Sequence, residues 1–128
     1  MERQSISLKL KYEGPETVEY YYEGAIIRDF SNAGVFEFDK KILKSLKENL
    51  DPTDFTLRAA SFLLNNQMRI IKLCNYPLIS ENGEDYHAIY AFAYILERYF
   101  HSGQLQTKLF CLSKSDLEFL KYEKILSH

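Results

Sequence analysis

The chain opens with hydrophobic and polar residues in alternation. From Ser5 to Tyr12 every even-numbered residue is apolar or aromatic and every odd-numbered residue is serine or lysine. A period of two is typical of a strand with one buried side and one solvent-facing side. The alternation resumes over Thr17–Glu23, and a further apolar run ends at Phe38. The sequence therefore predicts a small antiparallel β-meander of three or four short strands over residues 5–38.

Apolar residues at intervals of three and four follow the meander, as expected for amphipathic helices. They predict four helices, over residues 40–50, 52–74, 84–102 and 116–126, and residues 105–111 also suit an extra strand. Asp39 is the predicted cap of the first helix, and Gly103 is the predicted end of the third. The predicted fold class is α+β, in which the four helices pack over the meander in a single domain of residues 1–128.

Two interpretations compete for the segment from Met68 to Cys74. A polar stripe at helical spacing runs from Arg58 to Lys72, and it favours one long helix over 52–74. The same short segment also suits a strand, which would need a turn around Asn65. We prefer the single helix, because one stripe accounts for all the polar positions in it.

The helix predicted over 84–102 is the most apolar, and its polar residues again form a stripe. This possible ligand-binding stripe contains His87, Tyr90, Tyr94, Glu97, Arg98 and His101. Glu97 and His101 stand one helical turn apart, but two ligands are fewer than the three or four of a zinc site. We therefore expect no metal there and interpret the stripe as the solvated side of a mostly buried helix.

Charge is distributed unevenly along the chain. Residues 13–39 contain seven acidic residues and one basic residue, whereas the whole chain has a net charge of −2. In the second predicted strand, alternation places Glu19, Tyr21 and Glu23 on the solvent-facing side. A tyrosine between carboxylates suits contact with a basic protein partner, since tyrosine is enriched in interfaces and acidic groups steer association. Such charges also serve simply to discourage pairing between sheet edges.

Several classes of function are disfavoured by the sequence. It contains no nucleophile elbow, no glycine-rich phosphate loop, and no zinc or redox spacing between its two cysteines, so we expect no cofactor. A slightly negative net charge makes nucleic acid an unlikely partner. The longest apolar run, residues 88–96, is too short for a membrane span, and no secretory signal is visible, so the expected location is the cytoplasm.

These observations predict a non-enzymatic interaction module, such as an inhibitor, immunity-type or adaptor protein of the bacterial or phage accessory kind. Its partner would be a basic protein bound through the acidic sheet face at Glu19, Tyr21 and Glu23. An alternative is a small-ligand-binding domain with an aromatic-lined pocket, suggested by ten tyrosines and nine phenylalanines. A third interpretation is an enzyme that uses His87, Glu97 or His101. The sequence does not predict the oligomeric state.

Overall fold

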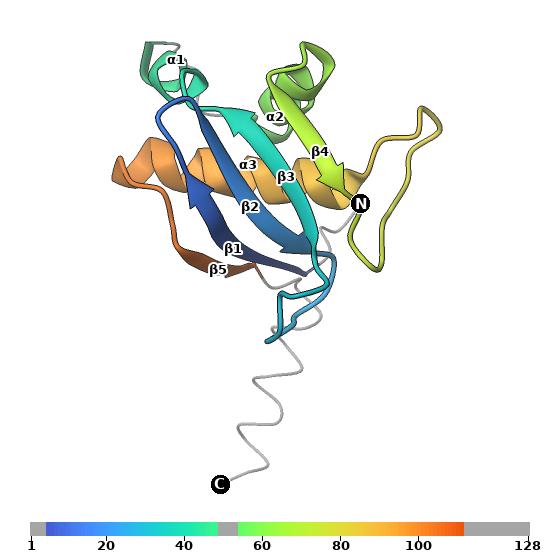
Figure 1. Ribbon diagram of the computed structural model, residues 1–128. Helices are drawn as coiled ribbons and strands as arrows, with labels where there is room; N and C mark the ends of the chain where they lie inside the picture. The colour runs from blue at the N-terminus through green and yellow to red at the C-terminus, as the bar shows by residue number, and fades with distance from the viewer. Residues whose placement is uncertain (1–4, 49–53, 112–128) are drawn as a thin grey trace, which may run out of the picture.

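The computed structural model describes residues 5–48 and 54–111, apart from the side chains of residues 47 and 48. Along the chain the elements are β1 (Ile6–Glu13), β2 (Thr17–Glu23), β3 (Gly34–Asp39), α1 (Ile42–Glu48), α2 (Phe55–Leu64), β4 (Met68–Lys72), α3 (Tyr86–Ser102) and β5 (Lys108–Cys111). The strands form one antiparallel sheet in the order β4-β3-β2-β1-β5. Helix α3 runs across one face of this sheet (Figure 1).

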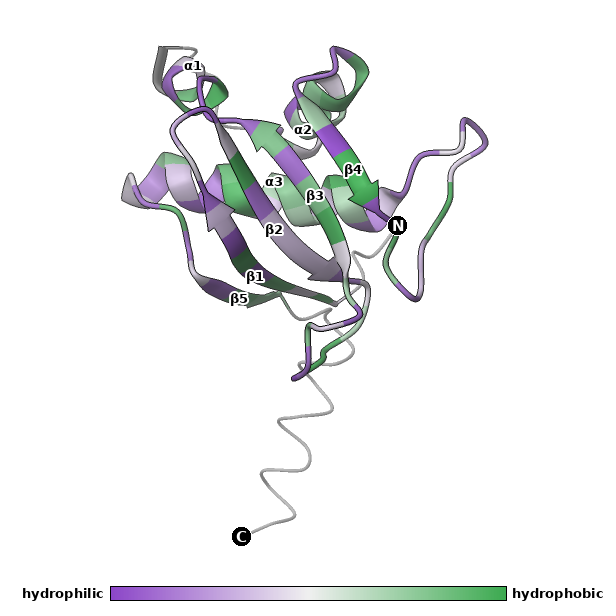
Figure 2. Ribbon diagram, in the orientation of Figure 1, coloured by the Kyte–Doolittle hydropathy of each residue, from purple (hydrophilic) through white to green (hydrophobic). Residues whose placement is uncertain are grey.

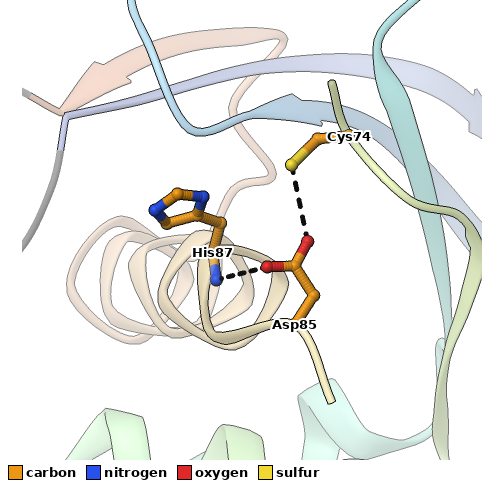
Figure 3. Close-up of side chains that lie close together, drawn as sticks. All are labelled: Cys74, Asp85 and His87. Atoms are coloured by element: carbon orange, nitrogen blue, oxygen red, sulfur yellow. Dashed lines mark hydrogen bonds between the residues drawn. The ribbon is translucent and has the colours of Figure 1, made fainter. Parts of the chain in front are cut away.

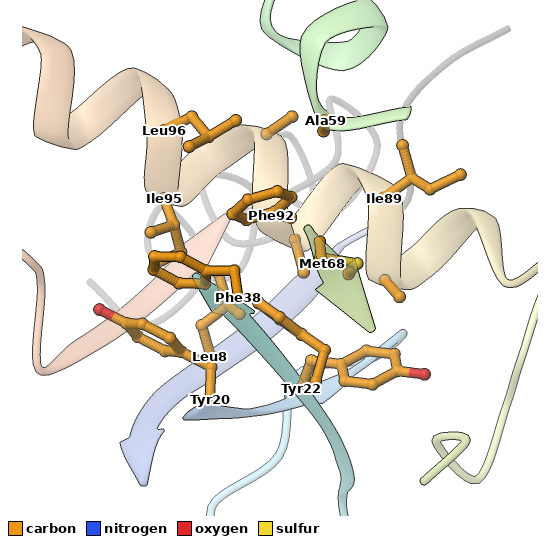
Figure 4. Packing of buried hydrophobic residues seen from close by; sticks show 14 of the residues in the cluster. Leu8, Tyr20, Tyr22, Phe38, Ala59, Met68, Ile89, Phe92, Ile95 and Leu96 are labelled. Carbon is orange, nitrogen blue, oxygen red and sulfur yellow. The ribbon is translucent and has the colours of Figure 1, made fainter. Parts of the chain in front are cut away.

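The predicted β-meander is confirmed as β1, β2 and β3. The alternation also places the expected side chains inward, because Val18, Tyr20 and Tyr22 of β2 are all fully buried. Figure 2 shows the same alternation of hydrophilic and hydrophobic residues along β3. Between the sheet and α3 the core is largely aromatic: the ring centroids of Phe38 and Phe92 are 4.9 Å apart (Figure 4). Burial of such rings is the main force that holds α3 on the sheet.

A register shift in β1 changes the side on which one predicted core residue lies. The pairing of β1 with β2 is irregular between Leu10 and Tyr12. Because an extra residue in a strand reverses the alternation beyond it, Tyr12 turns outward and is 51% exposed. The expectation that Tyr12 belongs to the buried side is therefore wrong.

The single long helix predicted over 52–74 is also wrong. Helix α2 ends at Leu64, and Asn66 adopts a left-handed conformation with φ of 57°. Asparagine tolerates this conformation better than most residues, so the Asn65-Asn66 pair turns the chain where a helix would continue. Strand β4 follows and pairs with β3, so that Met68 lies opposite Phe38 in the core.

The predicted four-helix α+β arrangement is corrected accordingly. Among the described residues there are three helices, of which only α3 is long, and a five-stranded antiparallel sheet. Strand β5 is the extra strand expected near 105–111, whereas the helix predicted over 116–126 lies outside the described residues. Asp39 does not cap a helix: it ends β3, and its carboxylate accepts a hydrogen bond from Arg69.

Both boundaries of α3 are set by capping residues. Its N-terminal cap is Asp85, and Gly103 ends it in a left-handed conformation with φ of 73°, which confirms the predicted stop. None of the helices in the described part of the chain is long and apolar enough to cross a membrane.

Candidate functional site: the open face of the sheet

The face of the sheet opposite α3 carries no helix from the described residues (Figure 1). We call it the open face. The strand registers place on it the side chains Lys9, Tyr12, Glu19, Tyr21, Val35, Glu37, Asp39, Arg69, Lys72, Lys108 and Phe110, and Lys11 joins them through its contacts with Tyr21 and Glu19. The segment that joins β2 to β3 crosses one end of this face, where Ser7 Oγ donates to the carbonyl of Ala25 and accepts from the amide of Ile27. The remainder of the open face is the candidate site.

Tyr21 lies at the middle of the open face, on the central strand β2. Its ring is half-buried: the centroid of Phe30 is 6.3 Å away, and the Nζ atom of Lys11 lies 6.0 Å from the centroid of the Tyr21 ring. Such packing holds the ring in place before any partner arrives. A tyrosine fixed in this way suits an interface anchor, because little conformational entropy is lost when it binds.

Acidic side chains line the open face next to Tyr21. Glu19 on β2 lies directly opposite Glu37 on β3, and Asp39 follows two residues later. These three carboxylates form the acidic stripe. Arg69 of β4 binds two of them, with 2.7 Å from Nε to Glu37 and 2.7 Å from Nη2 to Asp39, while Lys11 Nζ is 3.8 Å from Glu19. The two Arg69 contacts are short and each partner is only about a quarter exposed, so Glu37 and Asp39 are already paired within the protein. The Lys11 contact is long, which leaves Glu19 as the carboxylate of the stripe most open to other cations.

Basic side chains occupy the neighbouring strands of the same face. Lys9 of β1 lies opposite Lys108 of β5, and their Nζ atoms are 5.9 and 6.0 Å from the centre of the Phe30 ring. Lys108 also lies 5.2 Å from the ring of Phe110. The open face is therefore basic along β1 and β5, acidic along β2 and β3, and basic again at Arg69 of β4. A surface with such alternation is matched by a partner that presents both signs of charge.

Glu23 does not reach the open face. The expectation that it points to solvent is wrong, because its side chain is fully buried. Its carboxylate accepts four hydrogen bonds, from the backbone amides of Gly24, Asn75 and Tyr76 and from the side-chain amide of Asn75. Burial by itself would raise the pKa of Glu23, but these donors together hold it below its usual value. Glu23 therefore secures the segment after β4 to the end of β2.

Asp85 secures the same segment from the other side. Its Oδ1 atom accepts from the amide of His87 and its Oδ2 atom from the Cys74 thiol at 3.4 Å (Figure 3). Oδ1 also accepts from the amide of Leu78, and Oδ2 from the Tyr22 hydroxyl at 2.7 Å. Burial is the main reason why the pKa of the Cys74 thiol is raised, to about 12. Glu23, Cys74, Asp85 and His87 make up what we call the buried clasp.

The buried clasp contains the residue types of a metal centre. Cys74, Asp85 and His87 offer ligand atoms that all lie within 4.8 Å of one another. Each of these groups, however, already has a structural hydrogen bond. The Cys74 proton is donated to Asp85, and His87 Nδ1 lies 2.7 Å from the carbonyl of Tyr76, which only accepts, so Nδ1 carries a proton and only Nε2 has a free lone pair. The hydrogen bonds that these groups already make favour a structural role for the clasp.

Nucleophilic catalysis by Cys74 is opposed by the same geometry. A reactive cysteine needs a lowered pKa and a base beside it. Cys74 instead has a raised pKa, and its nearest charged neighbour is the Asp85 carboxylate, which disfavours a thiolate. The imidazole of His87 extends away from the carboxylate (Figure 3), and its Nε2 atom is buried with no hydrogen-bond partner among the described residues.

The polar stripe predicted on α3 divides into two parts. His87, at its start, is buried in the clasp, while Tyr90, Tyr94 and Glu97 are half-buried and His101 is exposed. Glu97 and His101 form no ion pair with each other or with another described residue. The structure therefore does not bring the stripe together as one site.

Sequence reasoning placed Tyr21 on the outer side of β2 and overlooked the clasp. Asp85 was recognisable, because an aspartate directly before a helical period is a favoured N-cap. Cys74 gave no such signal, since its hydrogen-bond partner Asp85 lies outside its own element, at the start of α3. Comparisons with protein-family models, with curated proteins and with solved structures found no match for this chain.

Proposed function

We propose that the protein is a non-enzymatic interaction module that binds a protein partner through the open face, with basic groups of the partner over the acidic stripe. The observation that carries this proposal is the position of Tyr21, half-buried at the middle of a helix-free sheet face and bordered by the acidic stripe. Tyrosine anchors at the centre of an interface commonly contribute more than 2 kcal/mol to binding, on the order of a thirtyfold change in affinity. The surrounding charges contribute mainly to recognition and to the association rate.

The charge pattern favours a protein over a nucleic acid. Phosphates approaching Lys9, Lys11 and Lys108 would meet the carboxylates of the acidic stripe on the next strands, which repel them. A protein partner can place basic residues over Glu19 and Glu37 and an acidic residue over Lys9 and Lys108. Glu23, which is buried, takes no part in this revised interface.

The proposal extends to the biological setting. An inhibitor, immunity-type or adaptor protein of a bacterium or phage needs no catalytic group, which agrees with the structural role of the buried clasp. We place the module in the cytoplasm, where reducing conditions keep cysteines such as Cys74 and Cys111 as thiols.

The proposal is tested by affinity capture from a bacterial lysate with four immobilised forms of the full chain. The expected result is a stoichiometric protein that is retained by the wild type and lost with Tyr21→Ala and with Glu19→Lys/Glu37→Lys. Tyr76→Ala is the matched control, because Tyr76 is an exposed tyrosine (69%) on the segment after β4. A partner retained equally by all four forms, or lost equally with Tyr76→Ala, would show that the open face is not the interface.

A further inference from the structure

A cleft of about 670 Å³ lies where the turn between β1 and β2 meets the start of α1. Its volume falls within the range of small-molecule sites, roughly 300–1,000 Å³. The backbone holds the two walls together, since the amide of Lys40 donates to the carbonyl of Glu16 at 2.8 Å. Tyr99 of α3 lines another side. The cleft is therefore formed by three segments that are distant in the sequence.

The cleft has an excess of positive charge. Three of its lining residues are lysines, of which Lys40 is engaged by Glu13 Oε2 and the carbonyl of Gly14, each at 3.3 Å. Lys41 and Lys44 are exposed and form no ion pair with any described residue. Two acidic residues also line the cleft. Asp39 is bound by Arg69, so Glu16 is the one acidic lining residue left to offset the charge of Lys41 and Lys44.

The remaining lining residues include an apolar surface. Leu43 is 4% exposed, and Tyr99 adds an aromatic ring, while Thr17 offers a hydroxyl group. Tyr99 is the single aromatic residue of the lining, so the cleft is not the aromatic-lined pocket that composition suggested.

We propose that this cleft binds a small organic anion. Its phosphate or carboxylate group would lie between Lys41 and Lys44, and its apolar body would lie against Leu43 and Tyr99. Lysine suits this role because its ammonium group is a compact point charge with three donors on a flexible stem. These four residues are not among those that form the open face, and Asp39 is the residue that the cleft and the open face share.

The proposal is tested by NMR titration of the isotopically labelled full chain. The probes are phenyl phosphate, benzoate and, as a neutral analogue, benzyl alcohol. Both anions are expected to shift the amide signals of residues 15–17, 39–44 and 99 in a saturable manner, and benzyl alcohol is expected to bind at least about fivefold more weakly. Tighter binding of phenyl phosphate than of benzoate would identify the ligand as a phosphate ester, and the reverse order as a carboxylate.

Three variants make the test specific. Lys41→Gln/Lys44→Gln should weaken the binding of the anions about fivefold or more, and Glu16→Gln should strengthen it, because the opposing carboxylate is removed. Lys72→Gln, an exposed lysine on β4, is the control and should leave the affinity unchanged. Equal affinity of the wild type and the double variant, or equal binding of benzyl alcohol, would overturn the proposal.

Discussion

At the scale of single residues, the most consequential finding is that Glu23 is a buried carboxylate. Sequence alternation located it on the outer side of β2, but alternation cannot show that a distant segment folds over the end of the strand. The amides of Asn75 and Tyr76 come from the segment after β4, which closes over Glu23. This part of the site could be obtained only from the three-dimensional structure.

We predict that Glu23→Gln lowers the free energy of unfolding by about 2 kcal/mol at pH 7, because buried amide donors lose a charged acceptor. The pKa of Glu23 is lowered on folding from its usual value of 4.5. Its contribution to stability is therefore complete above about pH 4.5 and is lost as the pH falls through the lower folded pKa. Urea denaturation between pH 7 and pH 3 should show a weaker pH dependence for the variant.

Glu19→Gln is the control for this experiment. Glu19 is half-exposed and its ion pair with Lys11 is long, so the variant should change the stability by less than about 1 kcal/mol. A stability of Glu23→Gln equal to that of Glu19→Gln throughout the pH range would contradict the account of the clasp.

A second prediction at the residue scale concerns the Cys74 thiol. With a pKa raised to about 12 and its side chain buried, it should react with a thiol reagent at pH 8 only as fast as the protein unfolds. The measurement is the labelling rate of Cys111→Ser in native buffer and in urea. Rapid native labelling would show that Cys74 is accessible and that the clasp opens.

At the scale of elements, the strands of the meander could be predicted, whereas the pattern could not decide between one long helix and the observed turn from α2 to β4, which was the interpretation not chosen. A period of two is unambiguous over seven or eight residues, as in β1 and β2. The polar stripe from Arg58 to Lys72 fitted a helical period by coincidence, because a short strand also alternates. The decisive feature is the backbone of Asn66, whose positive φ requires a turn.

This turn gives a prediction about the change from helix to strand. Asn66→Gly should leave the thermal unfolding temperature the same or slightly higher, whereas Asn66→Ala should lower the stability by about 1 kcal/mol, because alanine with a positive φ is strained. If Asn66→Ala proves as stable as Asn66→Gly, the chain is not left-handed at this position.

The junction between β3 and the clasp gives a further prediction. A Cβ atom on Gly34 would lie 2.6 Å from the backbone nitrogen of Cys74 and 2.6 Å from a ring carbon of Tyr22. A backbone atom cannot move aside without shifting the chain around it. Gly34→Ala should therefore lower the free energy of unfolding by roughly 2 kcal/mol or more. Gly83→Ala is the matched control: it has no neighbour within 4 Å and should cost only the strain of its φ of 82°, about 1 kcal/mol.

At the scale of the whole molecule, the fold places its functional groups by separating two faces. One face of the sheet is covered by α3 and holds the aromatic core. The other carries stripes of charge around Tyr21, and no described helix covers it. The sequence predicted the acidic character of this region and the outer position of Tyr21. The alternation also put Lys9 and Lys11 on the solvent-facing side, but the place of Lys108 was not predicted, because Lys108 reaches the face only when β5 pairs with β1.

The central claim is that the open face binds a protein partner with Tyr21 as its anchor. It is tested most directly by calorimetric titration of the purified partner with the wild type, Tyr21→Ala and Tyr76→Ala at low and high salt. We predict that Tyr21→Ala remains folded but binds about thirtyfold more weakly, that Tyr76→Ala binds like the wild type, and that salt weakens wild-type binding. Wild-type affinity in folded Tyr21→Ala, or binding indifferent to salt, would contradict the account.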